Sequence, residues 1–439
     1  MRSQVAQGAA RQVLTIWIAV LLSMAGISAT QAAEDEPLRL GVVTFLSGPG
    51  AGPFGIPAAN AAELVIAAIN AGTMPAPYDS KGIAGRTVMP EVIDEAGGVT
   101  KQVTEFRNLV QRRNVDAVVG YVSSGSCLGI APVAEELQTL TVFFDCGTPR
   151  IFEENDYHYV FRTAAHAAMD SVGAARYLLD RFPDTRSYAG INQNYAWGQD
   201  SWRDFAAAMK VLAPDSEVAT EQFPKLFAGQ YGSEISALAV SGADAVHSSL
   251  WGPDLESFLF QAAARGLPQD SVLVLSCGET TMFNLGANLP DGMIIGARGP
   301  YGVMAEPTPL NEWFRAEYEK RFGTSPTYPA YHMAQAILGL KAAADKAADA
   351  AGAPPDKEQI ISAFENLEYE AFGANIRMSL GKGHQAVTGI AYGLTKYDHD
   401  KDQPGIVDII RYDADCVNPP PGMHSVDWIE QGMPGAKCE

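Results

Sequence analysis

The sequence predicts an α/β fold made of two doubly wound lobes, each built on a parallel sheet. Apolar runs of strand length alternate with longer helical patterns along most of the chain. The alternation comes in two successive series, and about 400 residues are too many for one hydrophobic core. An apolar content of 47% and a mean hydropathy of −0.03 describe a globular chain.

The N-terminus has the layout of a secretory signal peptide. Arg2 and Arg11 give a basic region, residues 13–27 are almost free of polar groups, and small residues follow up to Ala33. The apolar core is shorter than the roughly 20 residues that a transmembrane helix needs. We therefore expect residues 1–33 to be removed and the mature protein to be exported.

The first series of elements predicts one lobe. The expected strands are 38–45, 88–94, 116–120 and 140–144, and the expected helices are 58–70, 100–113 and 131–137. Each strand is followed by a helix on its way to the next strand, which is the order of a parallel sheet.

The second series predicts the other lobe. Its expected strands are 188–191, 217–223, 243–250, 272–276 and 293–297, and its expected helices are 165–181, 199–212, 233–240 and 255–265. Helices are then expected at 310–322, 329–350 and 357–367, followed by a hairpin of 390–397 and 406–412.

The charge of the chain narrows the classes of partner. Its net charge is −20, and removal of the two arginines of the signal peptide makes it −22. A strongly acidic protein is a poor match for nucleic acid or for an anionic membrane surface. The predicted partner is a small molecule, and nothing in the sequence calls for a cofactor.

Five cysteines remain in a compartment where disulfides persist. Cys416 and Cys438 bracket a proline-rich tail, and Cys127 and Cys146 each lie just beyond one of two successive predicted strands. Pairs Cys127–Cys146 and Cys416–Cys438 would leave Cys277 free, although sequence alone leaves other pairings open.

Three motifs suggest chemistry that their context does not support. Residues 50–55 match G-x-G-x-x-G, but Asp94 lies too far along the chain for the acidic residue of a dinucleotide site. Cys127 stands at the centre of a nucleophile-elbow pattern, which leaves a cysteine hydrolase as a remote alternative. The aspartates of 398–402 lack the glycine and glutamate of a calcium loop, and the seven histidines lack zinc spacing, so no metal site is predicted.

Polar loops follow two neighbouring predicted strands. Ser123 and Ser124 come after the strand that ends at Gly120, and Cys146-Gly147-Thr148 come after the next strand. Hydroxyls and free N–H groups at a helix start bind carboxylates, and ligands of open α/β sheets collect at the carboxyl ends of strands. These loops predict a binding site without a catalytic group, so no enzyme activity is expected.

Several motifs, in order and spacing, resemble one known family. They are Ser47-Gly48-Pro49 with Phe54-Gly55, Ala67-Ala68-Ile69-Asn70, Gly85-Arg86 with Asp94, Gly120 with Ser123-Ser124-Gly125, Phe161-Arg162-Thr163, and Asn194-Tyr195-Ala196-Trp197-Gly198. Together they resemble the type I periplasmic solute-binding proteins of branched-chain amino acid ABC transporters. The resemblance runs from about residue 38 to residue 397.

The resemblance implies how the chain is divided between the lobes. Lobe 1 would comprise residues 38–160 and about 298–376, and lobe 2 would comprise 161–297 and about 377–412. Several crossover strands would join the lobes, which close on the ligand like a hinge. Residues 413–439 form a tail beyond the matched part, which a disulfide would pin.

The resemblance also implies a set of ligand-binding residues. Ser123, Ser124 and Thr148 would hold a carboxylate, and the backbone at Cys146 would help to hold an amino group. Aromatic side chains would clamp an apolar group, and Glu279 would receive an α-ammonium. The aromatic positions are Phe54, Tyr195, Trp197 and Trp251.

The implied function is that of the periplasmic, monomeric binding component of an ABC importer. It would deliver a hydrophobic amino acid, or an aromatic or short organic acid, to a permease in the inner membrane. Tryptophan at 197 and at 251, where the family often has tyrosine, suits a larger or aromatic acid as well as leucine. A ligand sensor of the same fold that signals to a partner protein is the alternative.

Overall fold

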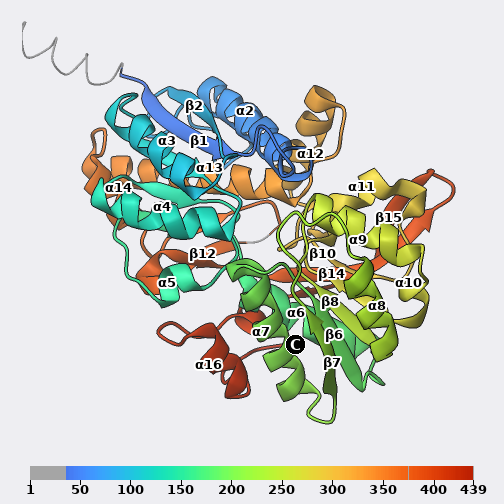
Figure 1. Ribbon diagram of the computed structural model, residues 1–439. Coiled ribbons are helices and arrows are strands. Elements are labelled where there is room, and N and C mark those ends of the chain that lie inside the picture. The colour runs from blue at the N-terminus through green and yellow to red at the C-terminus, as the bar shows by residue number, and fades with distance from the viewer. Residues whose placement is uncertain (1–35, 374, 439) are drawn as a thin grey trace, which may run out of the picture.

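The structure, a computed structural model, describes residues 36–373 and 375–438. The predicted signal peptide, residues 1–33, lies outside the described residues. The described chain forms two α/β lobes, one above the other in Figure 1, with a sheet in each. The predicted fold class is thereby confirmed.

The sheet of lobe 1 has eight strands in the order β11-β12-β13-β5-β4-β3-β1-β2. Neighbours from β2 to β13 run parallel, and β12 is antiparallel to both β11 and β13. Central strands such as β1 and β3 are buried almost throughout, as expected for parallel strands covered on both faces. The strands are β1 (Leu38–Thr44), β2 (Val88–Asp94), β3 (Ala117–Gly120), β4 (Thr141–Phe143), β5 (Val160–Arg162), β11 (Glu368–Glu370), β12 (Asn375–Leu380) and β13 (Gln385–Val387).

The sheet of lobe 2 has seven strands in the order β15-β14-β10-β9-β8-β6-β7. Neighbours from β7 to β10 are parallel, and the hairpin of β14 and β15 is added antiparallel at the edge. The strands are β6 (Ser187–Ile191), β7 (Glu217–Gln222), β8 (Ala245–Ser248), β9 (Val272–Leu275), β10 (Ile294–Gly296), β14 (Ile390–Asp398) and β15 (Gln403–Tyr412).

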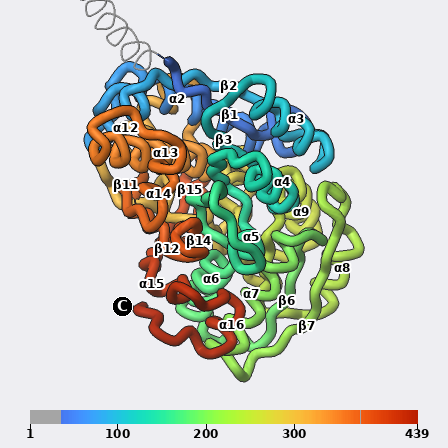
Figure 2. The backbone as a smooth tube through the Cα atoms, turned by 90° about the vertical axis from the view of Figure 1, so that its left-hand side faces the viewer, coloured from blue at the N-terminus to red at the C-terminus, as the bar shows by residue number. Residues whose placement is uncertain are grey.

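Helices cover both faces of the sheet of lobe 1. In Figure 2, α12, α13 and α14 lie on one side of its strands, and α3 and α4 lie on the other. The helices of this lobe are α2 (Ile56–Ala71), α3 (Val99–Gln111), α4 (Ser124–Glu136), α5 (Arg150–Glu153), α12 (Pro309–Phe322), α13 (Tyr328–Ala351) and α14 (Lys357–Phe364), and the short turn η1 (Ala51–Gly55) precedes α2. Residues 51–71 are long and apolar enough to cross a membrane by composition, but α2 packs against α13 and belongs to the core.

The helices of lobe 2 follow its strands in the same alternating way. They are α6 (Ala167–Arg181), α7 (Ala196–Leu212), α8 (Gly232–Ser241), α9 (Pro253–Ala263), α10 (Leu267–Asp270) and α11 (Met282–Leu285). The single turns are η2 (Gly278–Thr281), η3 (Gly286–Asn288) and η4 (Gly302–Met304), and η5 (Gly381–Gly383) joins β12 to β13 in lobe 1.

The chain passes between the two sheets three times. It leaves the first sheet after β5, returns after β10, and leaves again after β13. The third passage lies after Val387, which differs from the expected boundary near residue 376. The reason is that β12 pairs with the preceding β11, and β13 pairs with the distant β5, a long-range pairing that the local pattern does not predict.

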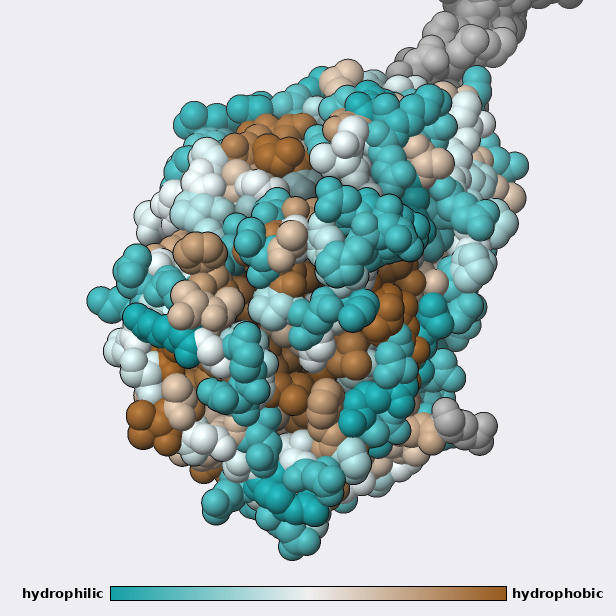
Figure 3. Space-filling model, turned by 90° about the vertical axis from the view of Figure 1, so that its right-hand side faces the viewer, coloured by the Kyte–Doolittle hydropathy of each residue, from teal (hydrophilic) through white to brown (hydrophobic). Residues whose placement is uncertain are grey.

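The C-terminal tail folds against lobe 2. It forms α15 (Ala414–Val417) and α16 (Ser425–Glu430), which pack against α6 and α7 and bury Trp428 completely. The structure pairs Cys416 with Cys438 and Cys127 with Cys146, as the sequence predicts, and Cys277 is free and buried. The face in Figure 3 is largely hydrophilic, and its hydrophobic residues gather mainly in recesses.

Candidate functional site

A cleft lies where the strand ends of the two lobes face each other. The loops after β3 and β4 contribute from lobe 1, and the loops after β6, β8, β9 and β10 contribute from lobe 2. This is the position where open α/β sheets bind ligands. The lining residues are Phe54, Val122, Ser124, Asp145, Gly147, Tyr195, Trp197, Trp251, Cys277, Arg298 and Tyr328.

Aromatic side chains form one wall of the cleft. The ring of Phe54 meets the edges of Trp251 and Tyr328, with centroids 5.0 Å and 5.5 Å apart. The indole Nε1 of Trp251 donates to the hydroxyl of Tyr195 at 2.8 Å, which fixes both rings. An apolar group is the partner that such a wall favours.

Ser124 supplies a hydroxyl to the lining of the cleft. It is the first residue of α4 and is almost completely buried. Its Oγ accepts hydrogen bonds from the backbone N–H groups of Gly147 and Thr148, at 3.2 Å and 3.1 Å. The hydroxyl proton then points away from these two donors, and it is available to an oxygen of a ligand.

Arg298 brings a positive charge to the cleft. Its guanidinium forms ion pairs with Asp145 and Asp170 and lies 4.6 Å above the ring of Trp197. Burial acts to lower the pKa of Arg298, but the two carboxylates outweigh it and raise the pKa, so the group stays charged. The site therefore places a guanidinium beside the ring of Trp197, with its charge balanced by Asp145 and Asp170 and its nitrogens donating to them and to the carbonyls of Asp145 and Ala165.

His332 completes this buried network from the side of α13. Its Nδ1 lies 2.9 Å from the carboxylate of Asp145. Burial lowers the pKa of His332, and the hydrogen bond to Asp145 only partly opposes this, so the imidazole is neutral at physiological pH. Asp145 is thus shared between Arg298 and His332.

The space between these side chains is small. The cavity volume is about 10 Å³, which is roughly the room that one water molecule needs. A larger ligand enters only when the lobes move apart or the rings turn, which is the behaviour of a hinged, closing site.

Comparison with known proteins agrees with this geometry. Residues 37–400 match the sequence model of a family described as periplasmic binding protein. The chain belongs to that family. Its resemblance to type I binding proteins of ABC transporters is confirmed.

A leucine-binding protein is a sequence relative of this binding protein, and proteins of similar fold include one solved with an aromatic acid. The leucine-specific-binding protein of Salmonella typhimurium is 22% identical over 278 residues, covering 63% of this chain and 71% of that protein. A solute-binding protein from Rhodopseudomonas palustris BisB5, solved with 3,4-dihydroxybenzoic acid, shares 19% identity at a TM-score of 0.72, covering 86% and 98% of the two chains. A leucine-binding protein from Thermotoga maritima shares 16% identity at a TM-score of 0.69, covering 85% and 98%. At these identities the solved structures show the shared fold.

Five of the nine predicted binding residues of this binding protein line the cleft. They are Phe54, Ser124, Tyr195, Trp197 and Trp251. Their roles in ligand binding stay predictions, but the structure brings them together from both lobes.

The other four predicted residues are not in the lining of the cleft. The N–H of Ser123 donates to Glu95, and the hydroxyl of Thr148 donates to Asp200 on α7. Cys146 lies in a disulfide, and its carbonyl accepts from Arg162. The carboxylate of Glu279 accepts from the N–H of Tyr328.

Sequence reasoning missed Asp145, Cys277, Arg298 and Tyr328 in the lining of the cleft. Arg298 follows the predicted strand 293–297 directly, so the strand-end rule applied to this strand would have found it. Asp145 and Gly147 flank Cys146, whose backbone the family resemblance assigns to the ligand site. Tyr328 had no local signal, because α13 approaches the cleft from a distant part of the chain.

Two of the three motifs whose chemistry the sequence context did not support have structural roles. Cys127 is bonded to Cys146, so it has no thiolate and the cysteine-hydrolase alternative loses its nucleophile. At Gly55 a Cβ atom would collide with the carbonyl of Phe45, so this glycine permits close backbone packing at the start of α2. Within residues 36–373 and 375–438, no group of three potential metal ligands comes together.

Proposed function

We propose that this protein is the substrate-binding component of an ABC importer, closing its two lobes on a small hydrophobic carboxylate. The observation that carries the proposal is the cleft itself. Its lining combines aromatic side chains centred on Phe54 and Trp251 with the polar groups of Ser124 and Arg298. A molecule with an apolar body and one carboxylate matches both parts of this lining.

Within that class, acids without an amino group fit best. Asp145, the acidic side chain that lines the cleft, is already paired with Arg298 and His332, and the carboxyl group of Glu279 accepts from the N–H of Tyr328. An ammonium would have to compete for one of them, and a buried ammonium without a partner is costly. Aromatic acids such as benzoates are therefore the first candidates, and hydrophobic amino acids are the second.

Closure of the two lobes is the conformational change that the transporter recognises. Residues on both lobes meet around the cleft, so a ligand that contacts both favours the closed state by its differential affinity. We propose that the mature protein acts in the periplasm as a monomer and delivers its ligand to a permease in the inner membrane. A sensor of the same fold would use the same closure to signal to a partner protein.

The experiment is calorimetric titration of the mature protein with matched pairs of ligands. 3-Phenylpropanoate and phenylalanine share one carbon skeleton, as do 4-methylpentanoate and leucine, and each pair differs by one amino group. We expect the plain acids and benzoates to bind at least tenfold more tightly than the amino acids. A preference for the amino acids would reverse our assignment of the ligand class.

Thermal unfolding gives an independent measurement of the same binding. A ligand at 100 times its dissociation constant stabilises the protein by about 2.7 kcal/mol, which is visible as a shift in melting temperature. Ser124→Ala should reduce the shift, because it removes the hydroxyl from the lining of the cleft. If no acid or amino acid gives a shift, the proposed ligand class is wrong. Where an acid does bind, its uptake by inner-membrane vesicles that depends on added binding protein would separate the importer from the sensor.

A further inference from the structure

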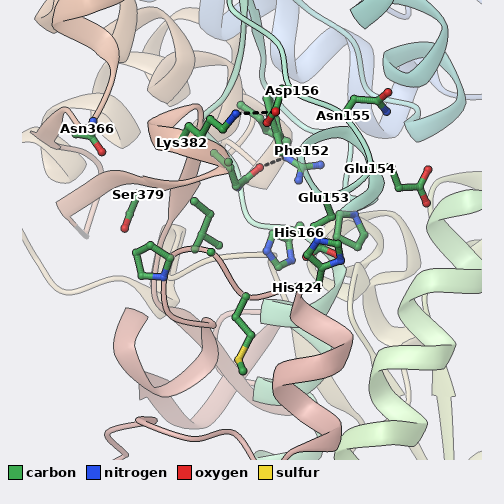
Figure 4. Close-up of a pocket in the computed structure, with 18 residues that line it drawn as sticks. Phe152, Glu153, Glu154, Asn155, Asp156, His166, Asn366, Ser379, Lys382 and His424 are labelled. Atoms are coloured by element: carbon green, nitrogen blue, oxygen red, sulfur yellow. Dashed lines mark hydrogen bonds and ion pairs between the residues drawn. The ribbon is translucent and has the colours of Figure 1, made fainter.

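A second and larger cavity lies at the junction of the lobes, away from the cleft. Its volume is about 730 Å³ (Figure 4). Three segments line it: residues 149–156 around α5, residues 379–385 between β12 and β13, and residues 421–424 of the C-terminal tail. The tail lies beyond residues 37–400, so one wall comes from a part of the chain that the family match does not include.

A buried arginine forms the base of this cavity. Arg162 is completely buried, and its Nε donates to Gln385 while its Nη1 donates to the carbonyls of Cys146 and Thr148. Its Nη2 has no hydrogen-bond partner among the residues that the structure describes. Burial lowers the pKa of Arg162 to about 9, so the guanidinium is still charged at neutral pH. An unpaired donor on a charged, buried group is expensive unless something binds it.

A histidine lies beside the same cavity with a free nitrogen. His166 is 2% exposed and lines the cavity (Figure 4), and its Nδ1 is without a partner in the described chain. Burial and then the charge of Arg162 lower the pKa of His166 well below its usual value. The neutral imidazole can therefore donate one N–H to an oxygen of a ligand.

The rim of the cavity has the opposite charge. Glu153, Glu154 and Asp156 line it. Asp156 is paired with Lys382 at 2.6 Å, and one oxygen of Glu153 accepts from the N–H of Ser425 in the tail. Acidic groups at the mouth disfavour polyanions such as nucleotides or phosphate. They tolerate a ligand whose remaining groups are neutral or positively charged.

We propose that this cavity is a second ligand site, for a small molecule with one carboxylate and a neutral or cationic remainder. The carboxylate binds the free Nη2 of Arg162 and an N–H of His166 once the ring of Phe152, which lies over the guanidinium and lines the cavity, turns aside, and the remainder lies between α5 and the tail. The site is separate from the cleft. Arg162 nevertheless donates to the carbonyls of Cys146 and Thr148, which flank Gly147 of the cleft. A carboxylate bound to Arg162 therefore lies next to a loop that lines the cleft.

Histidine NMR of the mature protein tests this proposal directly. Signals of His166 and His424, assigned with His→Asn variants, report on the cavity, because both side chains line it. The probes are propanoate and β-alanine, which share a chain and a carboxylate, with inorganic phosphate and tricarballylate as polyanions. We expect the first two to shift both signals saturably and the polyanions to bind at least tenfold more weakly.

Two variants locate the binding. Arg162→Gln removes the charge, and Met423→Trp fills the cavity from the tail while keeping Arg162, so each should weaken propanoate binding at least tenfold. Met89→Trp, at a surface position on β2, is the matched control and should leave the binding unchanged. If Arg162→Gln does not fold, Met423→Trp decides alone.

Other results would overturn the proposal. Absence of shifts with propanoate and β-alanine would do so, as would full binding in Met423→Trp. A response that disappears in Trp251→Ala, which alters the wall of the cleft and not the shared loop, would come from the cleft and would equally contradict a second site. The cleft is measured separately with the aromatic acids. A negative result at the second site therefore does not contradict the proposed transport function, and a negative result at the cleft does not contradict the second site.

Discussion

The carboxylate of Glu279 accepts a hydrogen bond from the backbone N–H of Tyr328 at 3.0 Å. Glu279 lies in η2 of lobe 2, and Tyr328 is the first residue of α13, which packs in lobe 1. Free N–H groups and the helix dipole favour an acidic group at a helix start. Glu279 therefore joins the two lobes at the edge of the cleft.

Glu279→Gln tests whether this carboxylate also binds a ligand. Because the N–H of Tyr328 already occupies it, we expect the variant to change the affinities for leucine and for 4-methylpentanoate by the same factor, as measured by calorimetry. A loss confined to leucine would instead assign Glu279 the ammonium-binding role that the family resemblance implies.

The contribution of Glu279 and Glu95 to the stability of the protein should fall as the pH rises from about 5 to 8, whereas the buried His166 and His332, whose pKa values are lowered, contribute in the opposite direction up to the usual histidine pKa. Burial raises the pKa of Glu279 to about 8 and that of Glu95 to about 7. The folded state then holds these protons more tightly than the unfolded state, so their contribution is complete below the usual glutamate pKa and is lost as the pH rises through those values. Urea unfolding at pH 5, 6.5 and 8 measures the change, on the order of 1 kcal/mol per pH unit for each group that is titrating.

Glu279→Gln should flatten this dependence, since glutamine does not titrate. Glu217→Gln, on the exposed strand β7, is the control and should keep the wild-type slope. An equal slope in both variants would show that Glu279 is not the group responsible.

Trp251→Ala should weaken the binding of the preferred ligand by about 1 kcal/mol or more. Trp251 packs against Phe54 and Phe227, with ring centroids 5.0 Å and 5.4 Å apart, so its loss opens the aromatic wall. Calorimetry gives the affinity, and Trp313→Ala on α12 controls for the loss of an indole outside the cleft. An unchanged affinity would remove Trp251 from the site.

Asp200→Asn should shift the protein towards an open form. Asp200 on α7 of lobe 2 accepts from the hydroxyl of Thr148 at 2.6 Å and pairs with Arg150 at 2.7 Å, both in lobe 1. Without the carboxylate the closed form loses charge-assisted hydrogen bonds that the open form does not make. We expect a larger radius of gyration by small-angle X-ray scattering and an affinity several-fold weaker.

Asp215→Asn, at an exposed position between α7 and β7, is the control for Asp200→Asn. Identical scattering from wild type and Asp200→Asn, each without ligand, would show that these contacts do not set the closure.

Local patterns were sufficient for most of the fold. The alternation of apolar runs located β1, β3, β6 and β9 within a few residues, because burial on both faces makes such strands continuously apolar. The same patterns could not place β12 and β13. Neither segment was expected as a strand, and only pairing with β11 and β5 puts them in the first sheet.

The sequence by itself determined the two-lobed α/β fold, the disulfide candidates, and the serine and aromatic residues that gather at the strand ends. Those properties follow from the order of local elements. Tertiary structure alone decided that Arg298 and Asp145 form the charged side of the cleft, that Glu279 turns to Tyr328, and that the tail encloses the cavity above Arg162. Each of these depends on the direction of a side chain across an interface between distant segments, and residue order does not fix that direction.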